Sequence, residues 1–515
     1  MRPTFLGFEA QKRTLQIAQK SLDITGNNLS NTNTVGYTRQ RVDLYAMYVS
    51  GNQNLRWCSD TNNLSVNGQG VNAHGIAQIR DPYIDKRYRE NVSVEAETEK
   101  TVEVLSELED VLDNFESDGL LYFTEQFFKA LQDYSVEKPD SAEVATLVAN
   151  SAVNLCRLLN DYDEQLTQVE ETYVAELEDT VTYINTVLDD INMLNDRIAR
   201  ELINYPEGYG PNELYDQLNL YIDEIANFGN IEVTKNENGT FSIDMAGVNI
   251  VDGEEFKVNR ILMEDYEIYG QAILFFESGD ELCPMTGQIR GYLNMINGNG
   301  VYATGTQNSE YGIAYFKSAV NEFARTIANT FNSANGADED PSRTMFTTDP
   351  EDVIFTAGNI HVAQGWQEDP TMIGQVRKLD PKTGMYYYGY DEITDDTGNV
   401  TLQNTNVLNL INQFEGKELK FGTAHDFKGG IYEYISFISD RLAQTIIYDQ
   451  SRNDSAVTTV DALLDARDEV SGVDMDEEGI NMLNYQKWYS ASSRMLTTLD
   501  DCLEKLINGT GRVGL

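Results

Sequence analysis

The longest stretch without glycine or proline lies between Pro139 and Pro206 and contains 66 residues. Because these two residue types end or bend helices, the whole stretch is free to form one continuous helix. At 1.5 Å per residue, that helix would be about 100 Å long. Apolar side chains recur in it every seven residues, at Leu177, Ile184, Ile191 and Ile198. This pattern predicts long helices packed side by side.

The period changes to two from Ile231, where apolar and polar residues alternate on both sides of Asn238-Gly239. Alternation around an Asn-Gly pair is typical of a hairpin, so we expect a β-meander within 231–285. Residues 336–404 are rich in turn sequences such as DEDPSR and DDTGN, which predict a small β-rich outer insertion. A final helical region is expected from about Asn404 onward, with a break near Ser471-Gly472.

The predicted fold is mainly α with β insertions. Long coiled-coil-like helices come from both termini, and a helical bundle and small β-rich regions lie between them. The first region joins residues 1–90 with 471–515 as a terminal coiled-coil domain with its connecting segment. The second joins 91–335 with 405–470 as the long-helix bundle that carries the meander. The third is the outer insertion, 336–404.

Both ends of the chain carry heptad stripes, which predict assembly interfaces. The seam positions near the two ends are Phe8, Leu15, Leu22 and Leu29, then Met482, Tyr485, Tyr489, Leu496, Leu499, Leu503 and Leu506. The stripes are thin, because Thr, Ser, Ala and Gln share the seams, so each helix alone would be marginal in water. The alternative is a pair of ordinary amphipathic helices on a local core. Asp474 and Glu477 have the spacing of a capping box at the start of the second helix.

Charge excludes several classes of partner. The 515 residues include 84 acids and 37 bases, which gives a net charge of −47. Nucleic acid and anionic membrane surfaces attract clustered lysine and arginine, so neither is expected to bind this chain. No apolar run approaches 18 residues, and the first twenty residues are amphipathic, so we expect neither a membrane span nor a cleaved signal peptide.

The residues that carry enzyme chemistry are scattered. His74, His361 and His425 have no metal-ligand spacing, and the four cysteines, Cys58, Cys156, Cys283 and Cys502, predict isolated reduced thiols. Residues 474–479 resemble the start of an EF-hand loop, but the glutamate required at its twelfth position would fall on Tyr485. No phosphate loop or nucleophile elbow occurs, and no pair of carboxylates is singled out. We therefore expect no enzyme, no metal and no cofactor.

The segment TGNNLSNTNTVGYTRQRVDL, which follows the first heptads, resembles the N-terminal signature of bacterial flagellar axial proteins. Asn and Thr bond to nearby backbone, and glycine permits a tight turn, so such a segment ends a helix. The Arg-Gln pair resembles the hook-associated protein 1 family, as does the later SGVDMDEEGINMLNYQ segment. The matching residues are Asn28, Asn31, Thr34, Gly36, Tyr37, Arg39, Gln40, Ser471, Gly472, Asp476, Glu477, Glu478, Tyr485 and Gln486.

Internal segments also resemble the family, in the same order, so the likeness spans nearly the whole chain. One departure is a bulkier and more polar C-terminal seam, with Lys487, Trp488, Ser490 and Ser492 where the family commonly has alanine. The outer insertion is also smaller than that of some members. The alternative within this resemblance is another axial protein of the hook or rod. An enzyme displayed on such a scaffold would need a metal or nucleophile motif in 336–404, and that stretch contains none.

The resemblance implies a structural protein at the hook-filament junction of an extracellular flagellum. Such a protein self-associates into a ring on the distal end of the hook, bound to the hook protein. The ring is the platform for the second junction protein and the filament. The resemblance also implies passage through the flagellar type III export apparatus and a cytoplasmic chaperone on the C-terminal helix, roughly 480–506. A chain without disulfides suits such a narrow channel.

Overall fold

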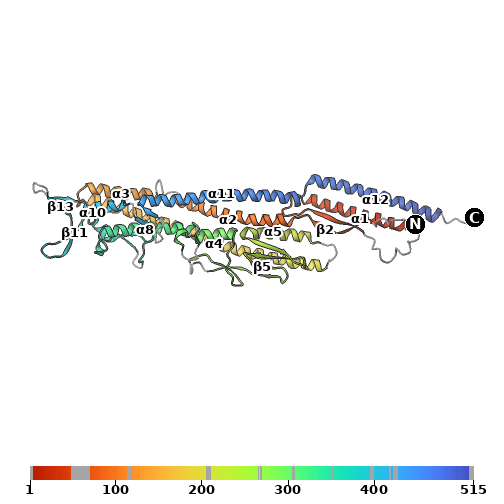
Figure 1. Cartoon of the computed structure of the whole chain (residues 1–515), viewed down its shortest axis with the longest axis horizontal. Coiled ribbons are helices and arrows are strands. Elements are labelled where there is room, and N and C mark those ends of the chain that lie inside the picture. Colours follow the sequence, from red (N-terminus) through yellow and green to blue (C-terminus); the bar gives the residue numbers. More distant parts are fainter. Residues whose placement is uncertain are drawn as a thin grey trace, which may run out of the picture.

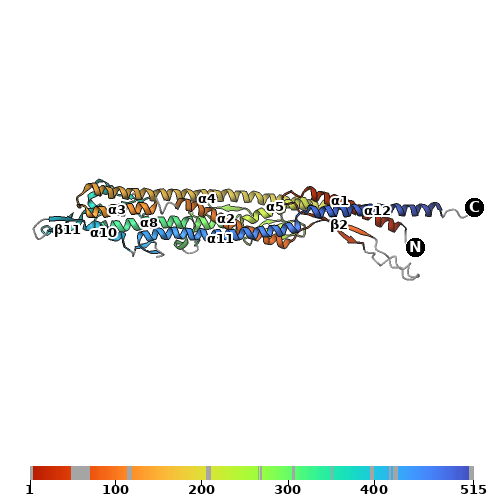
Figure 2. The same cartoon turned by 90° about the horizontal axis from the view of Figure 1, so that it is seen from above.

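The computed structural model describes residues 4–47, 70–112, 119–204, 210–264, 266, 270–303, 308–348, 352–394, 400–416, 419–421 and 427–509. The molecule is a long rod (Figures 1 and 2). Helices α1 (Thr4–Ser30) and α12 (Met475–Gly509) lie together at one end. The β11–β14 region lies at the opposite end, which we call the tip. Cys58 and His425 lie outside the described residues.

The two terminal helices pack against each other in antiparallel directions. Gly7, near the start of α1, lies against Leu499, whereas Asn28, near its end, bonds to Glu478 at the start of α12. Strands β1 (Gln40–Ala46) and β2 (Val71–Gln78) form an antiparallel ribbon beside this pair. The two ends of the sequence therefore meet in one structural unit.

Three long helices make the rod: α2 (Pro82–Leu112), α4 (Ala142–Asn204) and α11 (Ile431–Ser471). The predicted 66-residue stretch is helical over 63 residues, and Leu177, Ile184, Ile191 and Ile198 are all buried in the core. Shorter helices complete the bundle: α3 (Leu120–Val136), α5 (Asn212–Phe228), α7 (Gln288–Asn297), α8 (Ile313–Ala334) and α10 (Thr405–Phe414). In the described part of the chain, no helix is long and apolar enough to cross a membrane.

The expected β-meander forms a four-stranded antiparallel sheet, in the order β3-β4-β5-β6, that contacts α4. Gly239 has φ +83° in the turn between the first two strands, as the Asn-Gly pair predicts. A separate hairpin follows. The strands are β3 (Ile231–Lys235), β4 (Phe241–Met245), β5 (Val248–Asp252), β6 (Lys257–Val258), β7 (Ile261–Met263) and β8 (Leu274–Phe276).

The outer insertion consists of short strands and single helical turns. Its strands are β9 (Phe346–Thr347), β10 (His361–Val362), β11 (Val376–Leu379), β12 (Tyr386–Gly389), β13 (Asp391–Thr394) and β14 (Val400–Gln403). Its helical turns are η4 (Pro341–Arg343), α9 (Gln364–Glu368) and η5 (Pro370–Gly374), and η3 (Gly300–Tyr302) precedes α8. The strands form three separate two-stranded hairpins.

The expectation of one helical region from Asn404 to the break near Ser471 was wrong in part. Helix α10 ends at Phe414, and a hairpin of β15 (Leu419–Phe421) and β16 (Phe427–Gly429) separates it from α11. Glycines flank this interruption at 416 and 429–430, and glycine favours helix ends and turns. The predicted break is present, because α11 ends at Ser471 and α12 begins at Met475.

Candidate functional site where the terminal helices meet the rod

The heptad stripes of the terminal helices are only partly covered. On α1, Phe8, Leu15 and Leu22 are half-buried and Leu29 is exposed, whereas the small seam residues Ala18 and Thr25 are fully buried. On α12, the half-buried seam residues are Met482, Tyr485, Leu496, Leu499 and Leu503, and the exposed ones are Tyr489 and Leu506. The helix pair therefore leaves part of both stripes open to solvent.

Four further apolar side chains of α12 are exposed and were not among the predicted seam residues. They are Ile480, Leu483, Trp488 and Met495. Ile480 and Leu483 are three residues apart and Trp488 and Met495 are seven apart, so each pair shares one side of the helix, and the Trp488 ring lies edge-on to the seam residue Tyr485. The signal was present in the sequence, but the stripe facing α1 has more leucine and tyrosine. Helix α12 therefore exposes apolar side chains beyond those of the stripe that faces α1.

Asn28 organises the turn after α1. Its side-chain nitrogen donates to the Gln40 carbonyl oxygen (2.9 Å), and its oxygen accepts from the Gln40 backbone N–H (3.1 Å) and from the Tyr37 hydroxyl (2.8 Å). The same nitrogen also donates to a Glu478 carboxylate oxygen at 3.3 Å. Burial, followed by the charge of Asp216, raises the pKa of Tyr37 to about 12, so its hydroxyl stays protonated as a donor. Asn28 thus ties the turn to α12.

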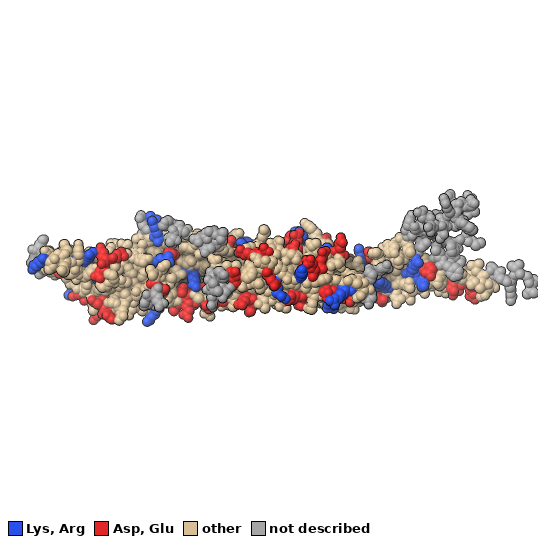
Figure 3. All heavy atoms as spheres, turned by 90° about the horizontal axis from the view of Figure 1, so that it is seen from below, with Lys and Arg blue, Asp and Glu red and all other residues tan. Residues whose placement is uncertain are grey.

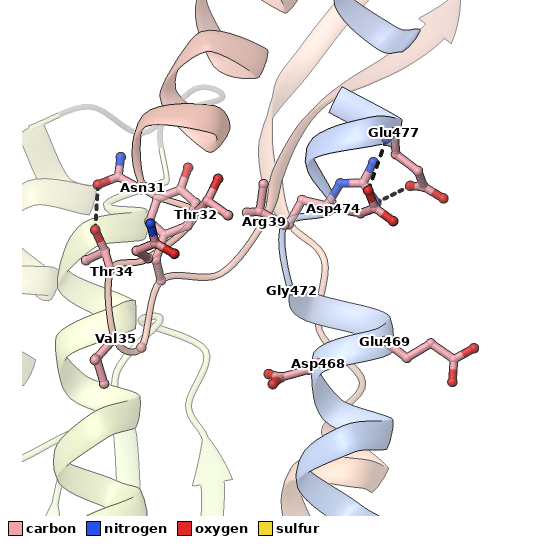
Figure 4. Close-up of a pocket in the computed structure, with 14 residues that line it drawn as sticks. Asn31, Thr32, Thr34, Val35, Arg39, Asp468, Glu469, Gly472, Asp474 and Glu477 are labelled. Atoms are coloured by element: carbon pink, nitrogen blue, oxygen red, sulfur yellow. Dashed lines mark hydrogen bonds and ion pairs between the residues drawn. The ribbon is translucent and has the colours of Figure 1, made fainter. Parts of the chain in front are cut away.

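Arg39 closes the same junction from the strand side. Its Nε donates to Oε1 of Glu478 at 2.8 Å, and its Nη1 donates to Oε2 of Glu477 at 2.7 Å. The Arg39 N–H also donates to the carbonyl oxygen of Ser471. Figure 4 shows Arg39 directed toward the first turn of α12, just beyond the break at Gly472. The conspicuous signature residues from both parts of the sequence therefore meet in space.

The predicted capping box is half formed. The Asp474 carboxylate accepts from the backbone N–H groups of Asp476 (2.7 Å) and Glu477 (3.3 Å), as an N-cap does. The Glu477 side chain pairs with Arg39, which takes it away from the reciprocal bond. Other signature residues lie outside the cluster: the side chains of Asp476 and Gln486 are exposed.

Gly36 lies where the turn touches the rod. Its φ is +76°, a conformation that costs little only for glycine, and an added Cβ would lie 2.5 Å from the Leu220 side chain of α5. Nearby, the Thr34 hydroxyl donates to the Asn31 side-chain oxygen at 3.1 Å. Both the conformation and the space therefore require glycine at this position.

A buried network of charges fixes the adjacent end of the rod. Arg467 of α11 contacts Asp85 of α2 at 2.8 Å and Asp223 of α5 at 2.7 Å. Arg80 also pairs with Asp85, and Arg89 pairs with Asp223. All five side chains are largely buried. Because every charge has a partner, the network holds three helices in one arrangement beside the terminal unit.

Asp216 of α5 carries the largest carboxylate pKa shift at this junction. Burial is the main cause and raises its pKa to about 6, although hydrogen bonding from Thr38 and the charge of Arg80 act in the opposite direction. Gln78 of β2 donates to one of its oxygens at 2.8 Å. Asp216 therefore joins the strand ribbon to the rod through a carboxylate that titrates near neutral pH.

The junction is built from hydrogen bonds and ion pairs between helices and strands. Among the residues described, no cluster of three or more His, Cys, Asp or Glu side chains is placed to hold a metal ion. His74 lies edge-on to Tyr45, and Cys156 is buried in the apolar core. The chemistry of the junction is that of buried hydrogen bonds and ion pairs that lock elements together.

Three family models match the chain in sequence order. The flagella basal body rod protein model matches residues 8–38, and the C-terminal model of the flagellar basal body rod FlgEFG protein matches 456–509. Between them, the model of the flagellar hook-associated protein FlgK helical domain matches residues 105–345. The end models are of rod-type proteins, so the central match is the one that separates the alternatives.

Relatives that align over nearly the whole chain support the assignment from the central family model. Flagellar hook-associated protein 1 of Bacillus subtilis is 28% identical, and the alignment covers 99% of both chains. The protein of the same name from Escherichia coli is 21% identical over 96% of this chain and 98% of its own length. These matches support a hook-associated protein of the FlgK family. The chain is a structural protein of the flagellar hook-filament junction, in a family of non-enzymatic flagellar proteins.

A solved structure supports the fold. The flagellar hook junction protein FlgK from Burkholderia pseudomallei aligns with a TM-score of 0.54 over 73% of this chain and 99% of its own length. At 11% sequence identity, this likeness bears on the fold alone. It agrees with the mainly α architecture with β insertions that the sequence predicts.

Proposed function

We propose that copies of this chain form a ring on the distal end of the hook and that the ring is the platform for the second junction protein and the filament. The observation that carries the proposal is the partly covered pair α1–α12 at one end of the rod. Apolar surface left in water favours association by about 25 cal/mol per Å² buried. Neighbouring copies would cover the open parts of both stripes and the further exposed apolar side chains of α12.

The proposed partners follow from the same helix pair. The hook protein would contact the ring on one side and the second junction protein on the other. Before export through the flagellar type III apparatus, a cytoplasmic chaperone would cover α12, because its exposed Leu483, Trp488 and Met495 would otherwise drive early association. The exported chain would then act outside the cell, in the flagellum.

We also propose that three regions of the chain have different roles. The terminal unit, 1–90 with 471–515, would make the assembly contacts, and the heptad residues of α1 and α12 would be its interface. The long-helix bundle, 91–335 with 405–470, would hold neighbouring units at a fixed spacing. The signature cluster around Asn28, Arg39 and Glu478 would set the angle between these two regions. The insertion, 336–404, would lie on the outer surface.

Deleting the gene from its bacterium tests the proposal. We expect cells with normal hooks, no filaments, and filament protein released into the medium. The full-length chain should restore filaments when supplied in trans. Filaments of normal number and length in the deletion strain would contradict the proposed place in assembly.

A further inference from the structure

A cavity of about 250 Å³ lies where α1, β1 and α12 meet. Two polar residues on its wall are buried, because Ser21 is 2% exposed and Gln40 is 5% exposed. Within the described residues, neither the Ser21 Oγ nor the Gln40 Nε2 has a hydrogen-bond partner. Buried polar groups nearly always have a partner, and an unsatisfied one costs free energy. The cavity wall therefore carries two groups that an incoming acceptor would satisfy.

The wall of this cavity indicates the chemistry of the missing partner. The Gln40 Nε2 can only donate a hydrogen bond, and the Ser21 hydroxyl can also donate one. Arg41, the next residue of β1, is exposed and also lines the cavity, and its guanidinium has no ion pair among the described residues. The Glu478 carboxylate on the wall is already paired with Arg39. Two neutral donors beside a cation fit a further carboxylate.

Asp476 presents such a carboxylate on the other side of α12. The residues of α12 that line the cavity are Glu478, Asn481 and Tyr485. With 3.6 residues per turn, these three lie roughly 140–200° around the helix from Asp476. The Asp476 side chain is exposed and forms no ion pair within the described part of the chain. One copy therefore carries the cavity on one side of α12 and the acid on the opposite side.

We propose that the Asp476 carboxylate of one copy enters the cavity beside Ser21 and Gln40 in the next copy around the ring. This inference rests on the proposed ring. A contact between opposite sides of identical subunits is heterologous, and such contacts form rings when the rotation closes.

The position of Asp476 along α12 agrees with helix pairs that lie side by side. Asp476 precedes Glu478 by two residues and Tyr485 by nine. At 1.5 Å per residue, the contact displaces neighbouring copies lengthwise by roughly 3–14 Å. Helix α12 has 35 residues, so it is about 50 Å long. So small a displacement leaves the α1–α12 pairs of neighbouring copies able to cover one another.

Position rather than charge selects Asp476, because acidic side chains are spread along the rod (Figure 3). Ile480 is 59% exposed and Leu483 57%, and they follow Asp476 by four and seven residues, so all three share one side of α12. A neighbouring copy that met Asp476 would also cover this apolar surface. Asp23 of α1 is another exposed acid near the cavity, but Lys20 lies three residues before it on the same helix.

Cysteine cross-linking in isolated flagella tests the contact. The four native cysteines are replaced by alanine, and two tagged versions of the chain are co-expressed. One carries Asp43→Cys on β1, and the other carries Met475→Cys beside Asp476; both positions are exposed. A short bis-maleimide is expected to join the two versions. Arg41→Glu in the first version, or Asp476→Lys in the second, should lower the cross-linked fraction at least fivefold, and the two together should restore most of it.

A further variant separates the contact from local stability. Ser21→Ala with Gln40→Met removes the two unsatisfied groups, so thermal unfolding of the monomer should stay unchanged or occur at a higher temperature. The cross-linked fraction should nevertheless fall at least threefold. Asp23→Lys is the matched control for Asp476→Lys and should leave the cross-linked fraction unchanged.

Incorporation of each variant into flagella is measured in parallel. Normal incorporation without a cross-link, or a charge-exchanged pair that is not restored, would overturn the contact and leave the proposed ring intact. An unchanged cross-linked fraction in the Ser21 and Gln40 variant would do the same, as would an equal loss in Asp23→Lys. A parent chain that never enters flagella would overturn both the contact and the ring.

Discussion

Arg39 and Glu478, 439 positions apart in sequence, form an ion pair of 2.8 Å that joins strand β1 to the first turn of α12. The Glu478 side chain is 3% exposed, whereas its neighbour Glu477 is 60% exposed. One arginine thus pairs with a buried and a solvated carboxylate. The buried pair is the one whose loss should be costly, because a buried charge without its partner is unfavourable.

Replacing Arg39 should therefore loosen the terminal unit. For Arg39→Ala we expect a loss of about 3 kcal/mol in the local stability of α1 and α12, measured by hydrogen exchange of the two helices. Glu477→Ala is the control, and an exposed pair of this kind should cost less than about 1 kcal/mol. Equal effects of the two substitutions would show that Glu478 does not depend on Arg39.

Substitution of Gly36 tests whether the turn after α1 packs closely against α5. Gly36→Ala combines a positive φ with a methyl group 2.5 Å from Leu220, so it should destabilise the junction by about 2–4 kcal/mol. Gly26→Ala, within α1 where the new methyl meets no atom within 4 Å, should instead be neutral or stabilise by up to about 1 kcal/mol. Thermal unfolding followed by circular dichroism measures both. A stable Gly36→Ala chain would argue against this packing.

Asp216 should give the junction a dependence on pH. Its pKa is raised to about 6 from 3.8, so its stabilising contribution is fully present below about pH 3.8 and is lost as the pH rises through 6. At pH 7.5, Asp216→Asn should be the more stable chain, by on the order of 1 kcal/mol. That advantage should shrink by pH 4.5, as measured by chemical denaturation. A difference that stays constant between these two pH values would mean that Asp216 does not titrate there.

The stripe of α12 should serve both chaperone and ring. Leu496→Asp with Leu503→Asp places two carboxylates on the half-buried face and should abolish both co-purification with the chaperone and incorporation into flagella. Ser493→Asp with Thr497→Asp adds the same charge at exposed positions and should retain both. If the leucine variant still bound the chaperone and still assembled, the stripe of α12 would not be the surface used for either contact.

Helices and strands could be predicted where apolar residues repeat at a regular interval along the sequence. The glycine-free run became α4, and the alternating residues around Asn238-Gly239 became β3 and β4. The heptads identified α1 and α12, although small residues such as Ala18 proved more buried than the leucines. The hairpin β15–β16 was missed because each of its strands has only three residues, too few to establish a period.

The geometry of the junction was less predictable. The signature residues were named from both parts of the sequence, but nothing local indicates that Asn28 bonds to Glu478, 450 positions away. Arg467 gave no sequence signal, because an isolated arginine among acidic residues resembles any solvated side chain. Its role depends on α2 and α5 converging on α11, which is set by packing of the whole bundle.

Hydrogen exchange on the purified monomer and on the assembled flagellum tests the central claim most directly. In the monomer, α1 and α12 should exchange much faster than α4, because their apolar stripes are only partly covered. In the assembled flagellum, both helices should become as protected as α4. Slow exchange of α1 and α12 in the monomer, with no further protection on assembly, would contradict the claim that these helices complete their packing only between copies.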